Sequence, residues 1–358
     1  MVPAGAIAPR LSHVIDLIET VYDFQTSDSE WLDAIADVGA PIFDHGLGFA
    51  IDEYVVTPRD EGAEVAIRTV RNVSLPLDYE TRFRDAVRAL PPEMLTRVHP
   101  LSYAGTWTEI SKGYPLESKR ALEKVGYVDE LGILARDPNG IGIRIIAPLP
   151  DVAELLPKSR EQWQMLGAHI ASAYRLRCAL ASAMVSGAAA ASGLPRHAEA
   201  VVDPQRFQIV EAVDRARGES AAQCLRRGAR RIDRARSKHG RQDPEEALRT
   251  WRALVCGRWS LIDWFDADER RFLLAMANPP EVRDPRGLTE RECQVVEYAV
   301  QGDTNKLIAY RLGLSQARVS ALLRSAMKKL GVKTRAQLAQ KLPPPPLVMA
   351  AREEQVAG

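Results

Sequence analysis

Apolar residues follow two regular spacings through the first half of the chain. Helical spacing of Leu, Ile, Val and Ala predicts helices over residues 11–24, 29–43, 79–90, 117–125 and 159–181. Alternating or continuous apolar runs between turn residues predict strands over residues 46–58, 63–76, 131–135 and 141–147. Asp137-Pro-Asn-Gly140 joins the last two strands, and Asn-Gly favours a hairpin because both residues tolerate positive φ.

The predicted order is two helices, a hairpin, further helices, a second hairpin and a long exit helix. An antiparallel sheet with helices packed on its faces accounts for that order. Residues 11–181 therefore resemble a GAF-type sensor domain, an α/β sandwich, and the resemblance implies that a ligand is sensed there. The exit helix carries an apolar stripe through Trp163, Leu166 and Ile170, which we expect to form part of a dimer interface.

A second and smaller set of elements follows a stretch rich in Ala, Ser and Gly. Residues 182–197 are predicted to be a linker. After them the pattern predicts strands at 198–202 and 207–210, helices at 219–237 and 244–256, and strands at 259–265 and 271–276. This order of a strand pair, helices and a strand pair is similar to a small PAS-like α+β module, which would cover residues 198–280.

Arginines gather on one side of the predicted helix at 219–237. They are Arg226, Arg227, Arg230, Arg231 and Arg234. The opposite side is apolar and includes Leu225 and Ile232. Two interpretations are open: a second surface for nucleic acid, or the solvated face of an amphipathic helix. The nearby acidic residues Asp233, Glu245 and Glu246 favour the solvated face.

Residues 288–342 predict four short helices with clear start and stop signals. Thr289 and Glu292 match the Ser/Thr-x-x-Glu capping box, and Gly302 suits the end of the first helix. A second helix at 305–312 and a third at 316–330 are joined by a tight turn at Gly313. Two helices joined by a short turn that contains Gly form a helix-turn-helix. The fourth predicted helix covers residues 334–342.

The third of these helices has two different faces. Its inward positions are Val319, Leu322, Leu323, Ala326 and Leu330. Gln316, Ser320, Arg324 and Lys328 recur every four residues on another face, where the only apolar groups are small methyls such as that of Ala321. Such a face suits the major groove, because Arg can reach guanine O6 and N7 and an Ala methyl can touch thymine. Ser315 and the N–H groups at the helix start can hold a phosphate.

The spacing of these residues resembles the LuxR-type helix-turn-helix domain. The matching segments are Leu288-Thr-Glu-Arg-Glu, Asn305-Lys-Leu-Ile-Ala309, Leu312-Gly-Leu-Ser315, Val319, Lys329-Leu-Gly-Val332 and Arg335. The resemblance covers residues 288 to about 342, and the DNA-binding domain is predicted over residues 285–342. It implies that Lys306 and Arg335 hold phosphates, that Ser320, Ala321 and Arg324 face bases, and that the fourth helix supports dimer contact.

The chain departs from the common LuxR pattern beside Val319. The family usually has Thr before this position and Lys after it, whereas this chain has Arg318 and Ser320. A basic residue has moved along the recognition helix, so the target sequence cannot be taken from a relative. The N-terminal half shows neither the acidic pocket of a receiver domain nor an acyl-homoserine-lactone pocket pattern.

Charge is distributed unevenly, which supports a nucleic-acid partner. The 358 residues carry a formal net charge of only +1, with 46% hydrophobic and 27% charged residues. Residues 285–342 nevertheless have a net charge of +7, and the rest of the chain has −6. A basic segment on an acidic body is the electrostatic pattern expected of a phosphate-binding domain.

Cysteine spacing and hydropathy indicate a cytoplasmic protein. The four cysteines are Cys178, Cys224, Cys256 and Cys293; they form no CxxC pair, so we expect neither a zinc ribbon nor a disulfide framework. The N-terminus lacks the basic start and apolar core of a secretion signal, and the Ala-rich stretch after Cys178 is too polar for a membrane span. Six scattered histidines show no metal spacing, so no catalytic residue, metal or cofactor is predicted.

The sequence therefore predicts a multidomain α+β transcription regulator. Sensor modules would control a domain that binds double-stranded DNA in the major groove, as a homodimer that responds to a small-molecule effector. Two alternatives stay open: an interaction protein whose basic domain contacts RNA polymerase, as similar sigma-factor domains do, and a ligand-binding enzyme. Residues 343–358 are predicted to be a Pro-rich flexible tail.

Overall fold

The computed structural model describes residues 7–59, 62–99, 102–136, 140–185, 193–278 and 288–342. It combines helices with two antiparallel sheets and divides into two compact units. The first unit holds most of residues 7–171, and the second holds most of residues 172–342. Several predicted segments lie outside the described residues: the hairpin turn at 137–139, most of the linker at 186–192, the start of the C-terminal segment at 285–287 and the tail at 343–358.

The first unit begins with two helices and then forms its sheet. Its elements are η2 (Leu11–His13), α1 (Val14–Val21), α2 (Asp28–Phe43), β1 (Phe49–Arg59), β2 (Gly62–Val73), α3 (Tyr79–Arg88), α4 (Pro92–Val98), β3 (Ser102–Thr106), α5 (Trp107–Ile110), α6 (Pro115–Val125), β4 (Asp129–Arg136), β5 (Ile141–Leu149) and the start of α7 (Pro157–Val185). The two predicted hairpins are confirmed as β1–β2 and β4–β5. The sequence did not predict α4, β3 or α5.

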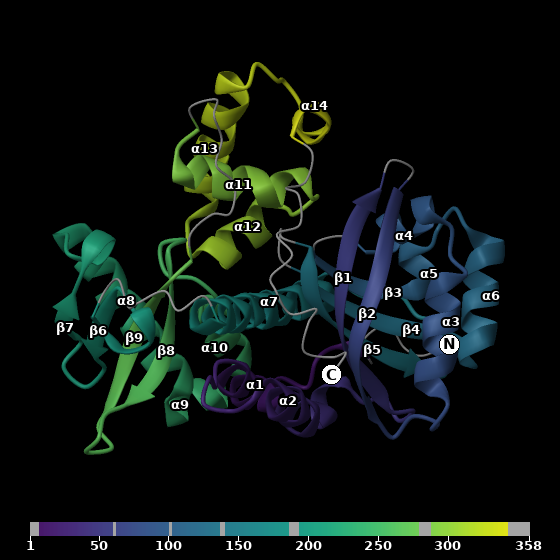
Figure 1. Cartoon of the computed structure of the whole chain (residues 1–358), viewed down its shortest axis with the longest axis horizontal. Helices are drawn as coiled ribbons and strands as arrows, with labels where there is room; N and C mark the ends of the chain where they lie inside the picture. The colour runs from purple at the N-terminus through teal and green to yellow at the C-terminus, as the bar shows by residue number, and fades with distance from the viewer. Residues whose placement is uncertain are drawn as a thin grey trace. The chain divides into compact units, whose positions relative to one another are not determined.

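The sheet of this unit has the strand order β2-β1-β5-β4-β3, with every neighbouring pair antiparallel. Strand β5 lies between β1 and β4, so the second hairpin inserts beside the first. Figure 1 shows α3, α4 and α6 gathered on one side of the sheet. Tyr79, Phe83 and Met94 from these helices pack there against Ile146 of β5.

The other side of the sheet is covered by α2 and the first part of α7. The ring of Phe43 contacts those of Phe49 and Trp163, with centroids 5.6 Å and 6.0 Å apart. Trp163 Nε1 also donates to the Ile7 carbonyl at 2.8 Å. Trp163, Leu166 and Ile170 are fully buried within the chain's own fold. The expectation that this stripe forms a dimer interface is therefore wrong, because the stripe belongs to the core of one protomer.

A buried polar cluster lies within the first unit. The Arg144 guanidinium donates from Nε and Nη2 to the Asp52 carboxylate at 2.9–3.2 Å, and both side chains are almost completely buried. Its Nη1 lies 2.7 Å from His99 Nε2, which must accept because arginine only donates. His99 Nδ1 then donates to the Leu95 carbonyl at 3.0 Å. Burial and the charge of Arg144 hold the pKa of His99 well below its usual range, which agrees with a neutral ring.

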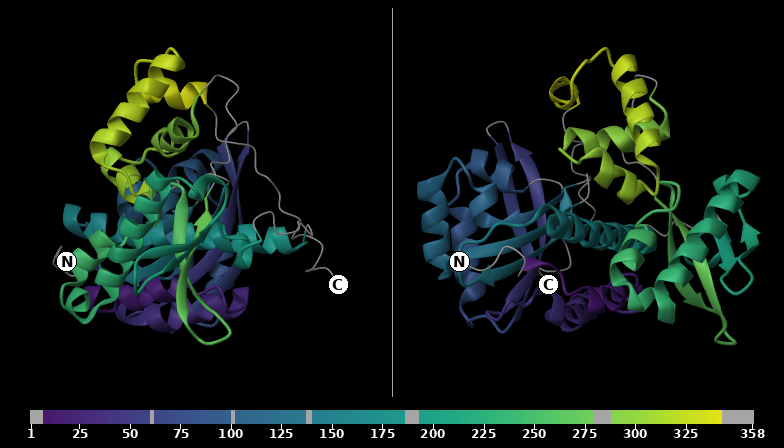
Figure 2. Two further views of the ribbon diagram at one scale, coloured as in Figure 1. Left: turned by 90° about the vertical axis from the view of Figure 1, so that its left-hand side faces the viewer. Right: turned by 180° about the vertical axis from the view of Figure 1, so that it is seen from behind.

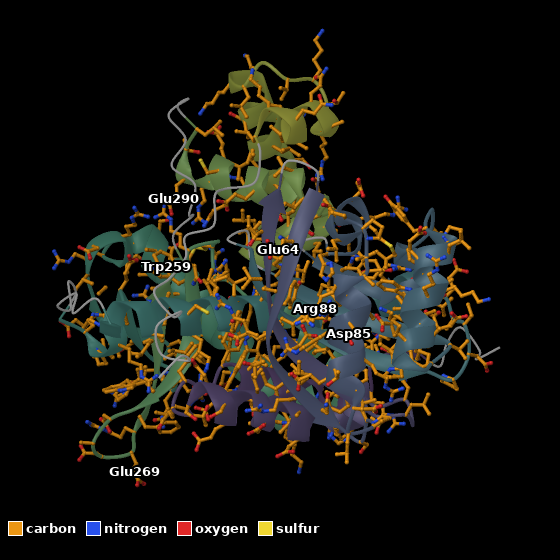
Figure 3. All side chains as sticks on the ribbon, turned by 45° about the vertical axis from the view of Figure 1, so that its right-hand side comes forward. Glu64, Asp85, Arg88, Trp259, Glu269 and Glu290 are labelled. Carbon is orange, nitrogen blue, oxygen red and sulfur yellow. A yellow bond between two sulfur atoms is a disulfide. The ribbon has the colours of Figure 1, made fainter. Side chains whose placement is uncertain are left out.

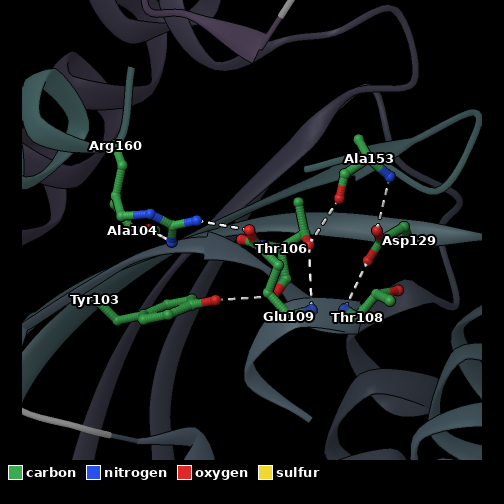
Figure 4. Close-up of polar contacts among 8 residues, drawn as sticks. All are labelled: Tyr103, Ala104, Thr106, Thr108, Glu109, Asp129, Ala153 and Arg160. Carbon is green, nitrogen blue, oxygen red and sulfur yellow. Dashed lines mark hydrogen bonds and ion pairs between the residues drawn. The ribbon is translucent and has the colours of Figure 1, made fainter. Parts of the chain in front are cut away.

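A second polar network fixes the turn after β3 (Figure 4). Thr106 caps α5 in a capping box with Glu109, and its hydroxyl donates to the Ala153 carbonyl at 3.0 Å. Asp129 accepts from the N–H groups of Thr108 at 3.1 Å and of Ala153 at 3.2 Å. The network ties the short β3–α5 segment to the chain that precedes α7, which holds an edge element that few apolar residues support.

The second unit contains a smaller sheet and a helical bundle. Its elements are the rest of α7, η3 (Pro195–His197), β6 (Ala200–Asp203), β7 (Gln208–Ala212), η4 (Asp214–Ala216), α8 (Glu219–Arg236), α9 (Lys238–Gln242), α10 (Pro244–Thr250), β8 (Trp259–Phe265), β9 (Arg271–Ala277), α11 (Glu290–Val300), α12 (Asn305–Leu312), α13 (Gln316–Lys329) and α14 (Arg335–Lys341). The sheet order is β7-β6-β9-β8, all antiparallel. We refer to residues 198–278 as the middle module.

The predicted order of a strand pair, helices and a strand pair is found in the middle module. Helix α8 buries Leu225, Ala229 and Ile232 and exposes its basic side, as its pattern predicted. The helix predicted at 244–256 is shorter, because α10 ends at Thr250 and the chain then turns toward β8. In the described part of the chain, no helix is both long and apolar enough to cross a membrane.

Two cysteines of the middle module form a disulfide, which the sequence did not predict. Cys224 of α8 is bonded to Cys256, which precedes β8, across a sequence separation of 32 residues. The expectation that the cysteines form no disulfide framework is therefore wrong for this pair. A CxxC pair is visible in the local sequence, whereas this bond depends on tertiary contact between α8 and the segment at 252–256. Cys178 and Cys293 are not part of this disulfide.

Candidate nucleic-acid interface

Helices α11–α14 form a compact group at the top of Figure 1, and both views in Figure 2 show the same grouping. The predicted bounds of all four helices are confirmed to within one or two residues. Gly313 ends α12 in the left-handed conformation, with φ +62°, which makes the tight turn before α13. Ser315 then caps α13, since its hydroxyl accepts from the Arg318 N–H at 3.2 Å.

Helix α13 separates buried and exposed side chains as its sequence predicted. Val319, Leu322, Leu323 and Ala326 are buried. Most predicted DNA-binding residues of this helix and its cap are exposed: Ser315, Gln316, Arg318, Ala321, Arg324 and Lys328. A polar and basic helix face with small residues at Ala317 and Ala321 can approach the floor of a major groove closely.

Two of the predicted residues, Ser320 and Arg335, are connected by hydrogen bonds through Asn305. Asn305 Nδ2 donates to the Ser320 hydroxyl at 3.0 Å, and the Arg335 guanidinium donates to the Asn305 side-chain oxygen. Ser320 and Arg335 are consequently half-buried, whereas Lys306 at the start of α12 is exposed. The network fixes α12, α13 and α14 relative to one another, so Ser320 and Arg335 also serve the structure of the domain.

Glu292 holds helix α13 against α11. Its carboxylate accepts from the Thr289 N–H at 2.7 Å, from the Ser325 hydroxyl at 2.6 Å and from Lys329 Nζ at 2.6 Å. Burial raises the pKa of this carboxyl, but the hydrogen bonds from Lys329, Ser325 and Thr289 outweigh it and lower the pKa to about 2. The sequence predicted the capping box alone. The bonds to α13 could not be read from spacing, because they join residues more than thirty positions apart.

Helix α12 is attached to the middle module through Tyr310. The Tyr310 ring is buried, and its hydroxyl is within hydrogen-bond distance of the carbonyl oxygens of Leu248 at 2.7 Å and Trp251 at 3.0 Å. The Arg252 guanidinium lies 4.8 Å from the centroid of the same ring. A tyrosine with a buried ring normally finds a partner for its hydroxyl, and here the partners belong to another part of the second unit.

Helix α11 adds further contacts with the middle module. Gln294 is almost completely buried, and its Nε2 donates to the Gly257 carbonyl at 2.6 Å. Glu290, labelled in Figure 3, accepts from Arg215 at 2.9 Å and lies 3.9 Å from Arg258. The sequence missed this interface. One signal for this interface was present in the sequence. Polar Gln294 and aromatic Tyr310 lie on helices whose apolar stripes already account for the domain's own core.

Comparison with known families identifies the segment that contains α11–α14. Residues 286–342 match bacterial regulatory proteins of the luxR family, described as GerE. A comparison with curated proteins finds none that matches the chain. The chain thus carries a LuxR-type DNA-binding domain over residues 286–342, which supports a regulator of transcription.

Proposed function

We propose that this protein is a transcription regulator in which sensor modules control a LuxR-type domain that reads double-stranded DNA in the major groove. The proposed domains are a GAF-like sensor at residues 11–181, a linker at 182–197, a PAS-like module at 198–280, the DNA-binding domain at 285–342 and a tail at 343–358. The observation that carries the proposal is the exposed polar face of α13, capped by Ser315 and backed by a fully apolar buried face.

The proposed roles within the DNA-binding domain follow from position and chemistry. Arg324 and Gln316 lie on the exposed face of α13, where their side chains can reach base edges, and the Ala321 methyl can touch thymine. Ser315 and Lys306 stand at the starts of α13 and α12, where phosphate oxygens can be held. Arg318, Ser320, Lys328 and Arg335 complete the proposed surface.

The sensing part of the proposal rests on the first unit and its pocket. Helices cover both faces of its five-stranded antiparallel sheet, as in the GAF-type arrangement proposed from the sequence. A pocket of about 880 Å³ lies beside α5 and α6, lined by residues that include Ser111, Pro115, Leu122, Tyr127 and Val152. Its size suits a small-molecule effector.

We propose a homodimer in the cytoplasm, with α14 rather than the exit helix at the subunit contact. Two-fold symmetry would place two copies of α13 on half-sites one DNA turn apart, about 34–36 Å. Leu338 is the buried residue of α14, and its remaining surface carries Ala336, Gln337 and Gln340, which are exposed in the single chain. No enzymatic activity is proposed.

The division between base and phosphate contacts is tested by two substitutions in the full-length protein. Arg324→Ala should weaken binding to a selected site by about 1–3 kcal/mol and leave binding to random duplex nearly unchanged, as a base contact does. Lys306→Ala should weaken both by a similar factor, as a phosphate contact does. Lys124→Ala, an exposed cation of the first unit outside the proposed effector pocket, is the matched control. Equal effects of the two variants on both duplexes would contradict the assignment.

The second candidate function is contact with RNA polymerase through the same basic domain. The observation that favours this candidate is the net charge of +7 on residues 285–342. Binding of full-length protein to duplex, measured with and without polymerase, separates the two. Sequence-selective binding without polymerase supports the regulator, and binding that depends on polymerase supports the alternative.

A further inference from the structure

A pocket of about 400 Å³ lies within the second unit, where the middle module meets the turn before the recognition helix. Helix α8 contributes Arg227 and Arg231, and the segment after α10 contributes Arg252. Gly313 and Ser315, from the α12–α13 turn and the cap of α13, line the opposite wall. The pocket thus brings three arginines next to the start of the helix proposed to read DNA.

Close backbone packing builds this pocket. The disulfide between Cys224 and Cys256 ties α8 to the segment at 252–256, and both cysteines line the pocket. A Cβ on Gly228 would lie 2.6 Å from Val255 Cγ2, so α8 approaches that segment as closely as only glycine permits. A Cβ on Gly313 would lie 2.1 Å from the Leu254 carbonyl oxygen. The arginines are therefore held on an ordered frame.

The three pocket arginines have no carboxylate partner among the described residues. The one hydrogen bond of Arg227 is a weak one to Cys224 Sγ at 3.5 Å, and Arg252 faces the Tyr310 ring. Other arginines of the same helix are engaged: Arg226 lies 3.3 Å from Glu219, and Arg236 lies 2.5 Å from Asp263. Arg230 and Arg234 also have no carboxylate partner among the described residues, but they lie outside the pocket lining, so position in the pocket is what sets Arg227 and Arg231 apart.

The acidic residues that favoured a merely solvated face are committed elsewhere. Asp233 lies 3.7 Å from Arg271, and Glu245 lies 2.5 Å from Arg249. Glu246 accepts from the Thr250 hydroxyl at 3.1 Å. None of the three closes an ion pair with a pocket arginine in the described structure, and Glu246 acts on Arg252 only through its charge.

The charges in the pocket act on one another. Burial lowers the pKa of Arg252, and the nearby charge of Arg231 lowers it further, whereas Tyr310 and Glu246 act in the opposite direction. Like charges held together without a counterion favour the binding of an anion. The N–H groups at the start of α13 add donors of the kind that hold phosphate oxygens.

We propose that Arg227, Arg231 and Arg252, with the start of α13, form a phosphate-binding site. Guanidinium groups match phosphate with two parallel hydrogen bonds, and several of them suit a group with more than one negative charge. Two sources carry that chemistry, the DNA backbone and a free phosphorylated small molecule. The DNA source rests on the proposed function; the free source does not.

The test compares two double variants of the full-length protein. Arg227→Gln with Arg231→Gln removes the exposed pocket charges and leaves Arg252 on Tyr310. Arg230→Gln with Arg234→Gln removes the same charge from the same helix outside the pocket lining. Circular dichroism should show that both pairs keep the wild-type helix content.

The first arm measures binding to a random-sequence duplex at several KCl concentrations. Each phosphate contact adds about 0.9 to the slope of log affinity against log salt. If DNA occupies the site, the pocket pair should reduce the slope by about one to two, and the outer pair should reduce it less. The second arm measures thermal unfolding with inorganic pyrophosphate at matched ionic strength. If a free phosphate occupies the site, pyrophosphate should raise the midpoint for wild type and the outer pair, but not for the pocket pair.

A clearly larger change in the pocket pair than in the outer pair, in either arm, supports the site and identifies its source. Identical behaviour of the two pairs in both arms overturns it. A wild-type protein that binds no duplex at all refutes the proposed function, and in that case the pyrophosphate arm alone decides whether the pocket binds phosphate.

Discussion

Arginine is used in opposite ways in the two units of this protein. In the first unit, Arg144 is buried with the Asp52 carboxylate and the neutral His99 ring. Its Nε and Nη2 donate to Asp52, and its Nη1 donates to His99. In the second unit, Arg227 and Arg231 stand at a pocket with no carboxylate partner among the described residues. An arginine with complete partners stabilises a fold, whereas a group of arginines without counterions can bind an anion.

The same contrast separates the two sides of the DNA-binding domain. Lys329 is a cation of α13 that is bound to Glu292, so it anchors the helix. Arg324 lies exposed on the same helix, and its Nε donates to the Ser320 carbonyl of that helix at 3.3 Å. Net charge alone counts these two residues equally. The partners of each side chain decide which cation holds the domain together and which can read DNA.

Breaking the buried pair should produce the largest loss of stability. Asp52→Ala leaves Arg144 buried without a counter-charge, which costs about 3–5 kcal/mol. Urea unfolding of the full chain, followed by hydrogen exchange in peptides from β1 and β5, measures the loss. Asp33→Ala is the control, because Asp33 pairs with Arg71 at the surface, and it should cost at most about 1 kcal/mol. Equal costs would show that burial of the pair does not matter.

Removing the disulfide should have the next largest effect. Cys224→Ser opens a covalent loop of 32 residues in the middle module, and a loop of this size contributes about 2–4 kcal/mol. Thermal unfolding of the oxidised proteins should show a lower midpoint for the variant, and reducing agent should lower wild type to a similar value. Cys178→Ser, which changes a cysteine outside the disulfide, should show no comparable difference between oxidising and reducing conditions.

Glu292→Gln should weaken the attachment of α13 and change its pH dependence. Hydrogen bonds to a charged group are worth about 1.5–3 kcal/mol in total here. The folded pKa of Glu292 is lowered to about 2, so its contribution is complete above the unfolded pKa near 4.5 and is lost as the pH falls through about 2. The stability difference between variant and wild type, measured by urea unfolding, should therefore shrink between pH 5 and pH 2. A constant difference would refute the charged carboxylate.

The smallest of these effects is expected at the interface between α12 and the middle module. Tyr310→Phe removes the hydroxyl bonded to the Leu248 and Trp251 carbonyls and keeps the ring, at a cost of about 0.5–1.5 kcal/mol. Hydrogen exchange should quicken in α12 and around residues 248–251. Tyr114→Phe, in the first unit, is a control for the substitution. Faster exchange in α12 alone would show that the interface does not couple the two regions.

The sequence predicted local structure well and tertiary partners poorly. The capping box at Thr289 and the two faces of α13 depend on residues three or four positions apart, so periodicity was sufficient. The bond between Cys224 and Cys256 joins distant residues, and no local rule could find it. The buried position of Leu166 shows the other limit, because an apolar stripe does not say whether its own chain or a second copy covers it.

The same reasoning applies to the predicted site. Gln316, Arg324 and Lys328 were identified from the periodicity of one helix and lie exposed together on it. The involvement of Ser320 and Arg335 in hydrogen bonds with Asn305 depends on three helices meeting. The sequence leaves two interpretations of the α8 arginines open, and the partners of Asp233, Glu245 and Glu246, which bear on them, depend on contacts that no helical period predicts.

Unbiased selection of duplexes by the full-length protein tests the central claim most directly. The account predicts enrichment of one sequence with two symmetric half-sites about 10–10.5 base pairs apart, and loss of that enrichment in Arg324→Ala. Folded full-length protein that enriches no sequence, or an Arg324→Ala variant that selects the same sequence equally well, would contradict the claim that the exposed face of α13 reads DNA.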